Sequence, residues 1–490
     1  MIFKGETMEI QLPTQDDIHV AYQQGEDAVV RLVEDLIGTI YMLVGINQKL
    51  TDQVSKNSKN SSLPPSSDGP KKVRRTRSLR NSGEKPNGGQ PGHEGHRLEP
   101  VEEPNDVIVH EVKCCEHCNR AIDDIPANRH NKRQVFDIPP VRIEVTEHRA
   151  QIKECPYCGK INQASFPDDV TQPTQYGPNI KAHAVYFNTQ HHIPLERTAD
   201  ILEDVFGCRV SEGMLIQSVT QCAKDVQPVN EITKQLLTNA QVAGFDESGV
   251  RVKNKTKWLH VASTPELTYY EVHEKRGGEA MQDIGILPHF TGNAVHDHWK
   301  PYLTFDGPTH SLCNAHHLRE LIFVADQYQQ DWAIDMIDLL VEINNAVKGL
   351  PPNVNQLDPE VVEAFEKRYD QILEQGFEIN PTPERAPGQR GRVKQPPAKN
   401  LLDRLHDYKA ETLRFMHDLR VPFDNNQSER DIRMIKVKLK VSGTFRSDEG
   451  ARAFCAVRGY ISTARKQGVK IIDAIKGVFQ GAPFIPRTNT

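Results

Sequence analysis

The chain has 490 residues, enough for about three domains at roughly 150 residues each. The 60 Lys and Arg residues against 66 Asp and Glu give a formal net charge of −6, so bulk charge alone does not indicate a nucleic-acid partner. No stretch approaches the roughly 18 apolar residues of a membrane span, and no secretory signal is recognisable. Nine cysteines, an odd number that includes CxxC pairs, fit a reducing compartment. We therefore expect a cytoplasmic protein with no membrane partner.

A heptad pattern predicts a helix over about residues 26–57, within an N-terminal segment 1–57. The d positions are Val29, Leu36, Leu43 and Leu50, and the a positions are Val33, Ile40, Asn47 and Val54. Polar Asn47 at an a position favours a parallel dimer in fixed register. We expect a coiled coil and hence a homodimer or higher oligomer. The alternative is a single amphipathic helix that packs on its own domain.

Residues 58–106 are rich in Ser, Pro, Gly, Lys and Arg and predict a linker without a core. Arg74, Arg75 and Arg77 are candidate DNA contacts because basic residues there can neutralise phosphates. The alternative is a linker kept in solution by its charge.

Two CxxC pairs predict a structural Zn²⁺ site within a small β-rich domain at residues 107–170. Its four thiolates are Cys115, Cys118, Cys155 and Cys158. Cys114 and His117 are rival ligands at the first pair, and His148 is a weaker rival. The alternation of Val141, Ile143 and Val145 indicates a strand, and Gly159 suits a tight turn after the second pair.

Residues 171–238 read as helices that bind DNA or connect domains. One helix ends near Gly207, and Ser211 is the expected N-cap of the next. A helix-turn-helix is one interpretation. Simple packing of two helices is the other, since the second helix carries few basic residues.

The following pattern predicts a ribonuclease-H-like α/β core. A short apolar run ends at Asp246, two strand-like runs and a helix follow, and another apolar strand ends at Asp297. Three strands, a helix and a fourth strand are the order of that fold, in which two carboxylates lie side by side and a third comes from a later helix. Here the later helix carries Glu429. Carboxylates suit Mg²⁺ or Mn²⁺, and two such ions can drive phosphoryl transfer. Glu247 and Asp306 are rival acids.

Ordered sequence blocks carry a family resemblance. They are NSSLPPSSD (60–68), GGQPGHEGH (88–96), the CxxC pairs, YGPNIKA (176–182), FDESGV (245–250), HDHWKPY (296–302), LCNAHHLREL (312–321), DNNQSERDIR (424–433) and KVSGTFRSDEGARAF (440–454). From residue 57 to the C-terminus the chain resembles the DDE transposases of insertion-sequence family sixty-six. In many relatives Thr stands where this chain has Ser248, and small residues stand where His296 and His298 flank Asp297.

The resemblance implies that Asp246, Asp297 and Glu429 form the DDE triad and that a zinc-binding domain precedes the core. It also implies a mostly helical insertion, which divides the core into parts at residues 239–313 and 424–490 around an insertion at 314–423. Cys313 and His316 look like the C-x-x-H near the start of such insertions. They form a structural staple in one interpretation, and are a buried thiol and a helix-capping His in the other.

Basic residues follow Glu429 closely, and Arg430, Arg433 and Lys436 are candidate DNA contacts. The alternative is a solvated helix face that pairs with acids. We expect a transposase that cleaves DNA at element ends and joins the 3′ hydroxyl to target DNA. Its partners would be DNA and, as the family usually needs, small accessory proteins. Other interpretations are a non-catalytic DNA-binding remnant and a metal-dependent nuclease.

Overall fold

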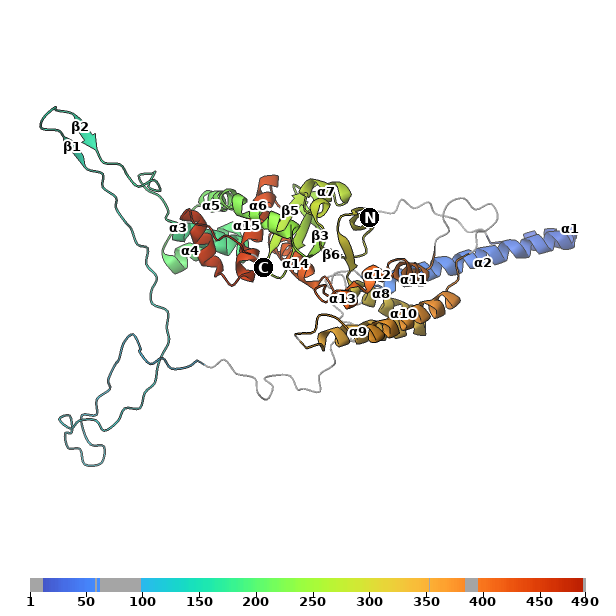
Figure 1. The fold of residues 1–490 in the computed structure, drawn as a ribbon, viewed down its shortest axis with the longest axis horizontal. Helices are drawn as coiled ribbons and strands as arrows, with labels where there is room; N and C mark the ends of the chain where they lie inside the picture. Colours follow the sequence, from blue (N-terminus) through green and yellow to red (C-terminus); the bar gives the residue numbers. More distant parts are fainter. Residues whose placement is uncertain (1–11, 58–59, 62–97, 352, 384–394, 488–490) are drawn as a thin grey trace.

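The computed structural model describes residues 12–57, 60–61, 98–351, 353–383 and 395–487. Arg74, Arg75 and Arg77 lie outside the described residues, as does most of the expected linker. The described chain is elongated, with a long helix α2 at one end and an irregular segment around β1 and β2 at the other (Figure 1). Between these ends lie a mixed α/β part and a bundle of helices.

A five-stranded sheet forms the centre of the α/β part. Its strands are β3 (Val242–Val252), β4 (Lys255–Ser263), β5 (Thr268–His273), β6 (Asn293–His296) and β7 (Thr309–Leu312), in the order β5-β4-β3-β6-β7. The first three strands are antiparallel to one another, whereas β6 and β7 run parallel to β3. Lys253 and Asn254 join β3 to β4 with positive φ at both residues, as a tight two-residue hairpin requires.

Helices cover both faces of the sheet. Successive residues of a strand point to opposite sides, so β3 has apolar side chains to bury on each face. Val250 and Val252 of β3 pack with α14 (Asn426–Ser442) and α15 (Asp448–Lys466). On the other face, Ala243 and Phe245 pack with three helical segments. These are α6 (Gln227–Thr238), α7 (Gly278–Ile284) and the 3₁₀ turn Leu287–His289. The alternation thereby assigns each β3 side chain to one helical layer.

A second helical group joins segments that are far apart in the sequence. Its helices are α3 (Pro178–Val185), a π turn at Tyr186–Gln190, α4 (Leu195–Phe206), α5 (Glu212–Asp225), α15 and α16 (Ile471–Phe479). The expected turn and cap are confirmed: Gly207 is left-handed with φ 65°, and the Ser211 side chain accepts from Met214 N. The chain before the sheet therefore packs against the chain after it.

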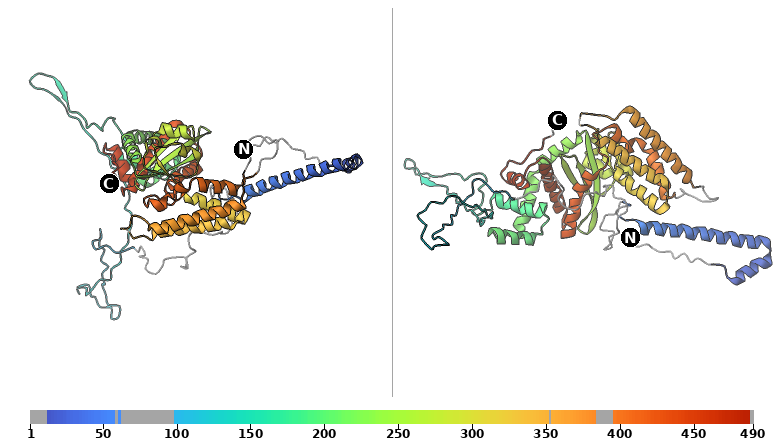
Figure 2. Two further views of the ribbon diagram at one scale, coloured as in Figure 1. Left: turned by 45° about the vertical axis from the view of Figure 1, so that its right-hand side comes forward. Right: turned by 90° about the horizontal axis from the view of Figure 1, so that it is seen from below.

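Between β7 and α14, where a mostly helical insertion is expected, the described segment is helical. It consists of α8 (Asn314–Tyr328), α9 (Asp331–Lys348), α10 (Pro359–Ile379), α11 (Pro397–Asp407), α12 (Lys409–Thr412) and α13 (Arg414–His417). Large buried side chains such as Trp332 and Tyr369 give it a core of its own. Figure 2 shows its longer helices side by side, away from the sheet.

At the N-terminus, α1 (Gln15–Gln24) is joined at Gly25 to α2 (Glu26–Ser55), which confirms the expected long helix. No residue of α2 is buried, and Val33, Ile40 and Leu50 are each about half exposed. The end of α2 is held to α8, since the hydroxyl of Tyr328 donates to Asp52 over 2.7 Å. The described residues therefore leave these three apolar side chains of α2 only partly covered.

The segment around the two CxxC pairs has little regular structure. Its strands β1 (Ile152–Glu154) and β2 (Ile161–Gln163) form a short antiparallel pair. The strand predicted at Val141, Ile143 and Val145 is wrong, because these residues lie in no strand and are exposed. None of the described helices is both long and apolar enough to cross a membrane.

Candidate active site

Asp246 lies in the middle of β3, and the prediction that its strand ends there is wrong. The parallel pairing of β3 with β6 stops at Gly244, whereas the antiparallel pairing with β4 continues to Val252. Asp246 therefore lies two residues beyond the last pair of the parallel ladder. By alternation it shares the face of Val250 and Val252, which is the face that α14 covers.

Asp297 directly follows β6, as predicted. Its Oδ1 accepts a hydrogen bond from Trp299 N over 2.9 Å, which fixes the carboxylate at the strand end. Because β6 is the parallel neighbour of β3, this position brings Asp297 beside Asp246.

Glu429 is in the first turn of α14, and an unusually close approach of α14 to β3 positions it. Asn425 Nδ2 donates to Phe245 O over 2.7 Å, and the hydroxyls of Ser428 and Ser263 lie 2.9 Å apart. Gly244 permits this approach, since a Cβ there would overlap the side-chain oxygens of Asn425 and Ser428. Sequence reasoning overlooked this glycine, although glycine inside a strand often marks a close backbone approach.

Gly244→Ala should separate α14 from β3. We expect the free energy of unfolding to fall by about 2 kcal/mol, as for other overpacked cores. We also expect activity to fall by a larger fraction than stability, because Glu429 moves with its helix. Urea unfolding of the full chain measures the first effect. Gly249→Ala in the same strand is the control, since its nearest neighbour would lie 3.9 Å from the new methyl group. Equal stability of the two variants would contradict this account.

The three acids influence one another electrostatically. Burial raises the pKa of Asp246 to about 8. The negative charges of Glu247, Asp297 and Glu429 add to this increase. Such a concentration of carboxylates favours either a proton or a cation.

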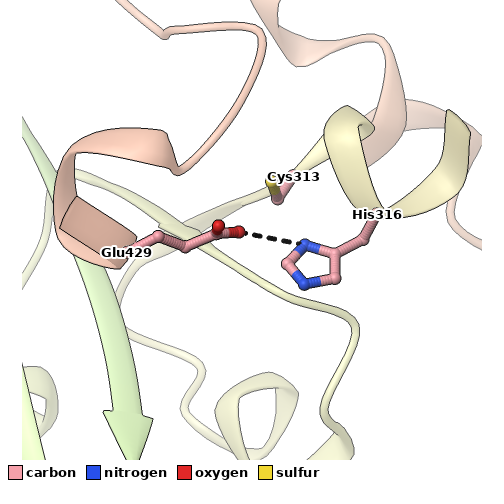
Figure 3. A group of neighbouring side chains, drawn as sticks. All are labelled: Cys313, His316 and Glu429. Atoms are coloured by element: carbon pink, nitrogen blue, oxygen red, sulfur yellow. Dashed lines mark ion pairs between the residues drawn. The ribbon is translucent and has the colours of Figure 1, made fainter. Parts of the chain in front are cut away.

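Glu429 does not point into a closed cluster with the other two acids. Instead its carboxylate faces the start of α8, as Figure 3 shows. Its Oε1 lies 3.3 Å from Nη2 of Arg319 and 3.7 Å from Nδ1 of His316. Ligand atoms of Cys313, His316 and Glu429 all lie within 4.8 Å of one another, which makes this the one group of three or more possible metal ligands among the described residues. Cys313 and His316 therefore meet the proposed catalytic glutamate, which their sequence spacing did not predict.

The structure separates the rival acids from the site. Glu247 occupies the opposite face of β3, where Arg276 Nη2 donates to its Oε1 over 2.7 Å and the Tyr302 hydroxyl donates to its Oε2. Asp306 is exposed, in the loop before β7. Neither acid shares the α14 face with Asp246.

The histidines that flank Asp297 pack inward. His296 is fully buried, stacks on Tyr302 at 4.6 Å and shares a 2.9 Å hydrogen bond with His310, and burial lowers its pKa to about 3. The ring of His298 packs edge-on against Tyr408 at 4.5 Å. Both therefore support the loop that carries Asp297.

Basic side chains form an exposed face on α14. Arg430, Arg433 and Lys436 are exposed, whereas Ile432 and Ile435 of the same helix are buried against the sheet. Arg430 donates to Gln427, and within the described part of the chain none of the three basic residues forms a salt bridge. This favours their availability to an external anion over the alternative of pairing with acids.

The two CxxC pairs adopt the same turn. In each, the first cysteine accepts a backbone bond from the residue four positions later and donates to the carbonyl five positions later, all over 2.9 Å. The backbone N–H groups within each turn lower the pKa of Cys115 and Cys155. The knuckle cysteines, as we call Cys115, Cys118, Cys155 and Cys158, fit two halves of a zinc site. The structure does not bring the two halves together.

Comparison with protein families gives two matches. A family described as "Transposase IS66 family" matches residues 173–453, which include the sheet, the insertion and α14. A family of unknown function matches residues 12–99. No curated protein matches the chain.

Proposed function

The chain belongs to the IS66 family of transposases, and from this premise we propose that it is a DDE transposase with Asp246, Asp297 and Glu429 as its catalytic acids. The observation that carries the proposal is the convergence of three elements. Asp246 on β3 and Asp297 after β6 lie beside each other just beyond the end of the parallel ladder, and α14 brings Glu429 over the same face. We also propose a ribonuclease-H-like fold for the core, supported by the strand order and by the antiparallel and parallel pairings.

The acids fit divalent cations because their negative charges are crowded and partly buried, as the raised pKa of Asp246 indicates. When bound, two Mg²⁺ or Mn²⁺ ions held by Asp246, Asp297 and Glu429 would activate the attacking oxygen and stabilise the leaving one. Oxygen ligands alone suit these hard cations.

Backbone N–H groups orient the two aspartate carboxylates. Glu247 N–H donates to Asp246 Oδ1 over 2.8 Å, and the Trp299 N–H holds Asp297, so that both carboxylates are fixed before DNA arrives. In the proposed reaction water first attacks a phosphodiester at the element end. The freed 3′ hydroxyl then attacks a phosphodiester of target DNA, with one P–O bond formed and one broken in each step.

The basic face of α14 is proposed to hold DNA next to the acids, since Arg430 directly follows Glu429. Arg433→Ala should weaken binding to duplexes of any sequence and reduce the slope of log affinity against log salt by about 1, as expected for loss of one phosphate contact. Fluorescence anisotropy at several salt concentrations measures both. Arg368→Ala is the matched control, because that arginine pairs with Glu342 over 2.8 Å in the insertion. An unchanged slope in Arg433→Ala would exclude the contact.

Two other regions of the chain would contribute to the proposed transposase. The exposed apolar side chains of α2 favour a coiled coil between two copies, which would hold two DNA ends together. The two knuckles are proposed to share one structural Zn²⁺ ion after they come together. A full-length chain that sediments as a monomer at micromolar concentration would contradict the first of these proposals.

The experiment that tests the function uses purified protein, Mn²⁺ and a duplex that carries the element's own end. We expect nicked ends and joined products, both absent with Asp297→Asn. Cleavage without joining would favour the nuclease. Products that persist at the same level in Asp297→Asn would remove this acid from the site.

A further inference from the structure

The start of α8 and the start of α14 place three side chains of different chemistry around one point (Figure 3). Cys313 caps α8, His316 lies in its first turn, and Glu429 lies in the first turn of α14. Cys313 and His316 are three positions apart and Glu429 follows His316 by 113 positions (429 − 316), yet their sulfur, nitrogen and oxygen atoms lie within 4.8 Å of one another.

Hydrogen bonds between these three side chains do not explain why they lie together. The His316 Nδ1 atom is buried and has no hydrogen-bond partner, and its 3.7 Å separation from Glu429 Oε1 is too long for a hydrogen bond. A buried polar atom without a hydrogen-bond partner costs roughly 1–3 kcal/mol of stability. A ligand bound by His316 Nδ1 would remove this cost.

The surroundings of Cys313 suit a sulfur atom that binds a metal ion. It is 1 % exposed, and the backbone N–H of Asn425 points to its Sγ over 3.1 Å. Groups that donate to a ligand atom from outside the metal site orient it and tune its affinity. Asn425 belongs to the segment that leads into α14, so the same contact fixes Glu429 relative to the sulfur.

We propose that Cys313, His316 and Glu429 bind one Zn²⁺ ion, which fastens the first helix of the insertion to the helix that carries the third catalytic acid. Thiolate, imidazole and carboxylate are all ligands of zinc, whereas Mg²⁺ does not select sulfur. The ion takes Oε1 of Glu429 and replaces the 3.3 Å contact from Arg319, which keeps its bond to Ala315 O. Oε2 of Glu429 remains available to the site of Asp246.

This site is separate from the proposed zinc site of the knuckle cysteines. It also does not rest on the proposed function, since metal binding by these three side chains requires no DNA chemistry. In the proposed transposase, the bound ion would make the insertion and the helix that carries Glu429 move as one body.

Cobalt titration of the full chain tests the proposal, with the knuckle cysteines replaced by Ser to remove their signal. Co²⁺ reports thiolate ligation by a sulfur-to-metal charge-transfer band and tetrahedral geometry by intense visible bands. We expect one equivalent to bind with both signatures, and Zn²⁺ to displace it. Cys313→Ser should abolish the charge-transfer band, whereas Cys208→Ser, a control at another buried cysteine, should retain it.

Two further variants keep the result interpretable if Cys313→Ser unfolds. His316→Gln should retain the sulfur band and weaken cobalt affinity at least tenfold. Asp246→Asn should leave the spectrum unchanged, so loss of transposition in that variant is distinguishable from loss of zinc. Absence of cobalt binding, or a spectrum that Cys313→Ser and His316→Gln both leave intact, would overturn the proposal.

Discussion

Asp246→Asn should abolish DNA cleavage and joining and at the same time make the protein more stable near pH 8. The loss of activity should be at least ~10³-fold, because the variant removes a metal-binding charge that acts in the transition state. The gain in stability follows from burial, which raises the pKa of Asp246 to about 8, above the roughly 3.9 of an unfolded chain.

The direction of the pH effect is fixed by these values. The stabilising contribution of the protonated Asp246 is fully present below about pH 4 and is lost as the pH rises to about 8. Asn carries no charge and has no such loss. The stability difference between the variant and the wild type should therefore grow from about pH 4 to about pH 8 and then stay constant, reaching a few kcal/mol at most.

Urea unfolding across this pH range measures the difference. Mg²⁺ should raise the melting temperature of the wild type and leave that of Asp246→Asn unchanged, because only the wild type has the full ligand set. Asp306→Asn is the control, since Asp306 is exposed and outside the site. An inactive Asp246→Asn variant whose stability relative to the wild type is no greater at pH 8 than at pH 5 would show that burial does not raise the pKa of Asp246 in this way.

Arg276→Ala should destabilise the protein by about 3 kcal/mol, the largest effect we expect from a residue outside the acid triad. Its guanidinium lies between the rings of Trp258 and Trp299, 4.9 and 4.0 Å from their centroids, and donates twice to Glu247. The Glu247 side chain is only 2 % exposed, so removal of the arginine leaves a buried carboxylate without its cation. The 38 % exposure of the Arg276 side chain places the effect at the low end of the range for buried pairs.

A double-mutant cycle identifies the cause. Glu247→Gln in the Arg276→Ala background should recover part of the lost stability, since the unpaired charge is then absent. Lys275→Ala is the control, because the neighbouring lysine is exposed and makes only a 3.8 Å pair with Glu279. Additive effects in the cycle would show that packing between the tryptophans, and not the buried charge, is what the arginine provides.

The local parts of the fold were predictable from sequence. The heptad of α2, the cap at Ser211 and the strand that ends at Asp297 depend on residues close in the chain. The extent of β3 was not, because the apolar run stops at Phe245 whereas alternate burial continues through Val250 and Val252. The alternation of apolar residues at 141–145 also predicted a strand that is absent, because no neighbouring strand pairs with this segment.

The candidate site, like the fold, was predictable from sequence only in part. Asp246, Asp297 and Glu429 were selected by residue type and position, and alternation on β3 separates Asp246 from Glu247. The orientation of Glu429 toward Cys313 and His316 depends on contact between α8 and α14 across the insertion. The sequence spacing of these residues does not give their distance in space, because that distance depends on how the starts of α8 and α14 pack together.

Transposition itself is measured by counting insertions into a second replicon from a donor that carries this gene and its native flanking DNA. Wild type is compared with Glu429→Gln, and Glu449→Gln on the exposed start of α15 is the control. We predict that insertions disappear with Glu429→Gln and persist with Glu449→Gln. Equal counts for wild type and Glu429→Gln would contradict the assignment of Glu429 as the third catalytic acid.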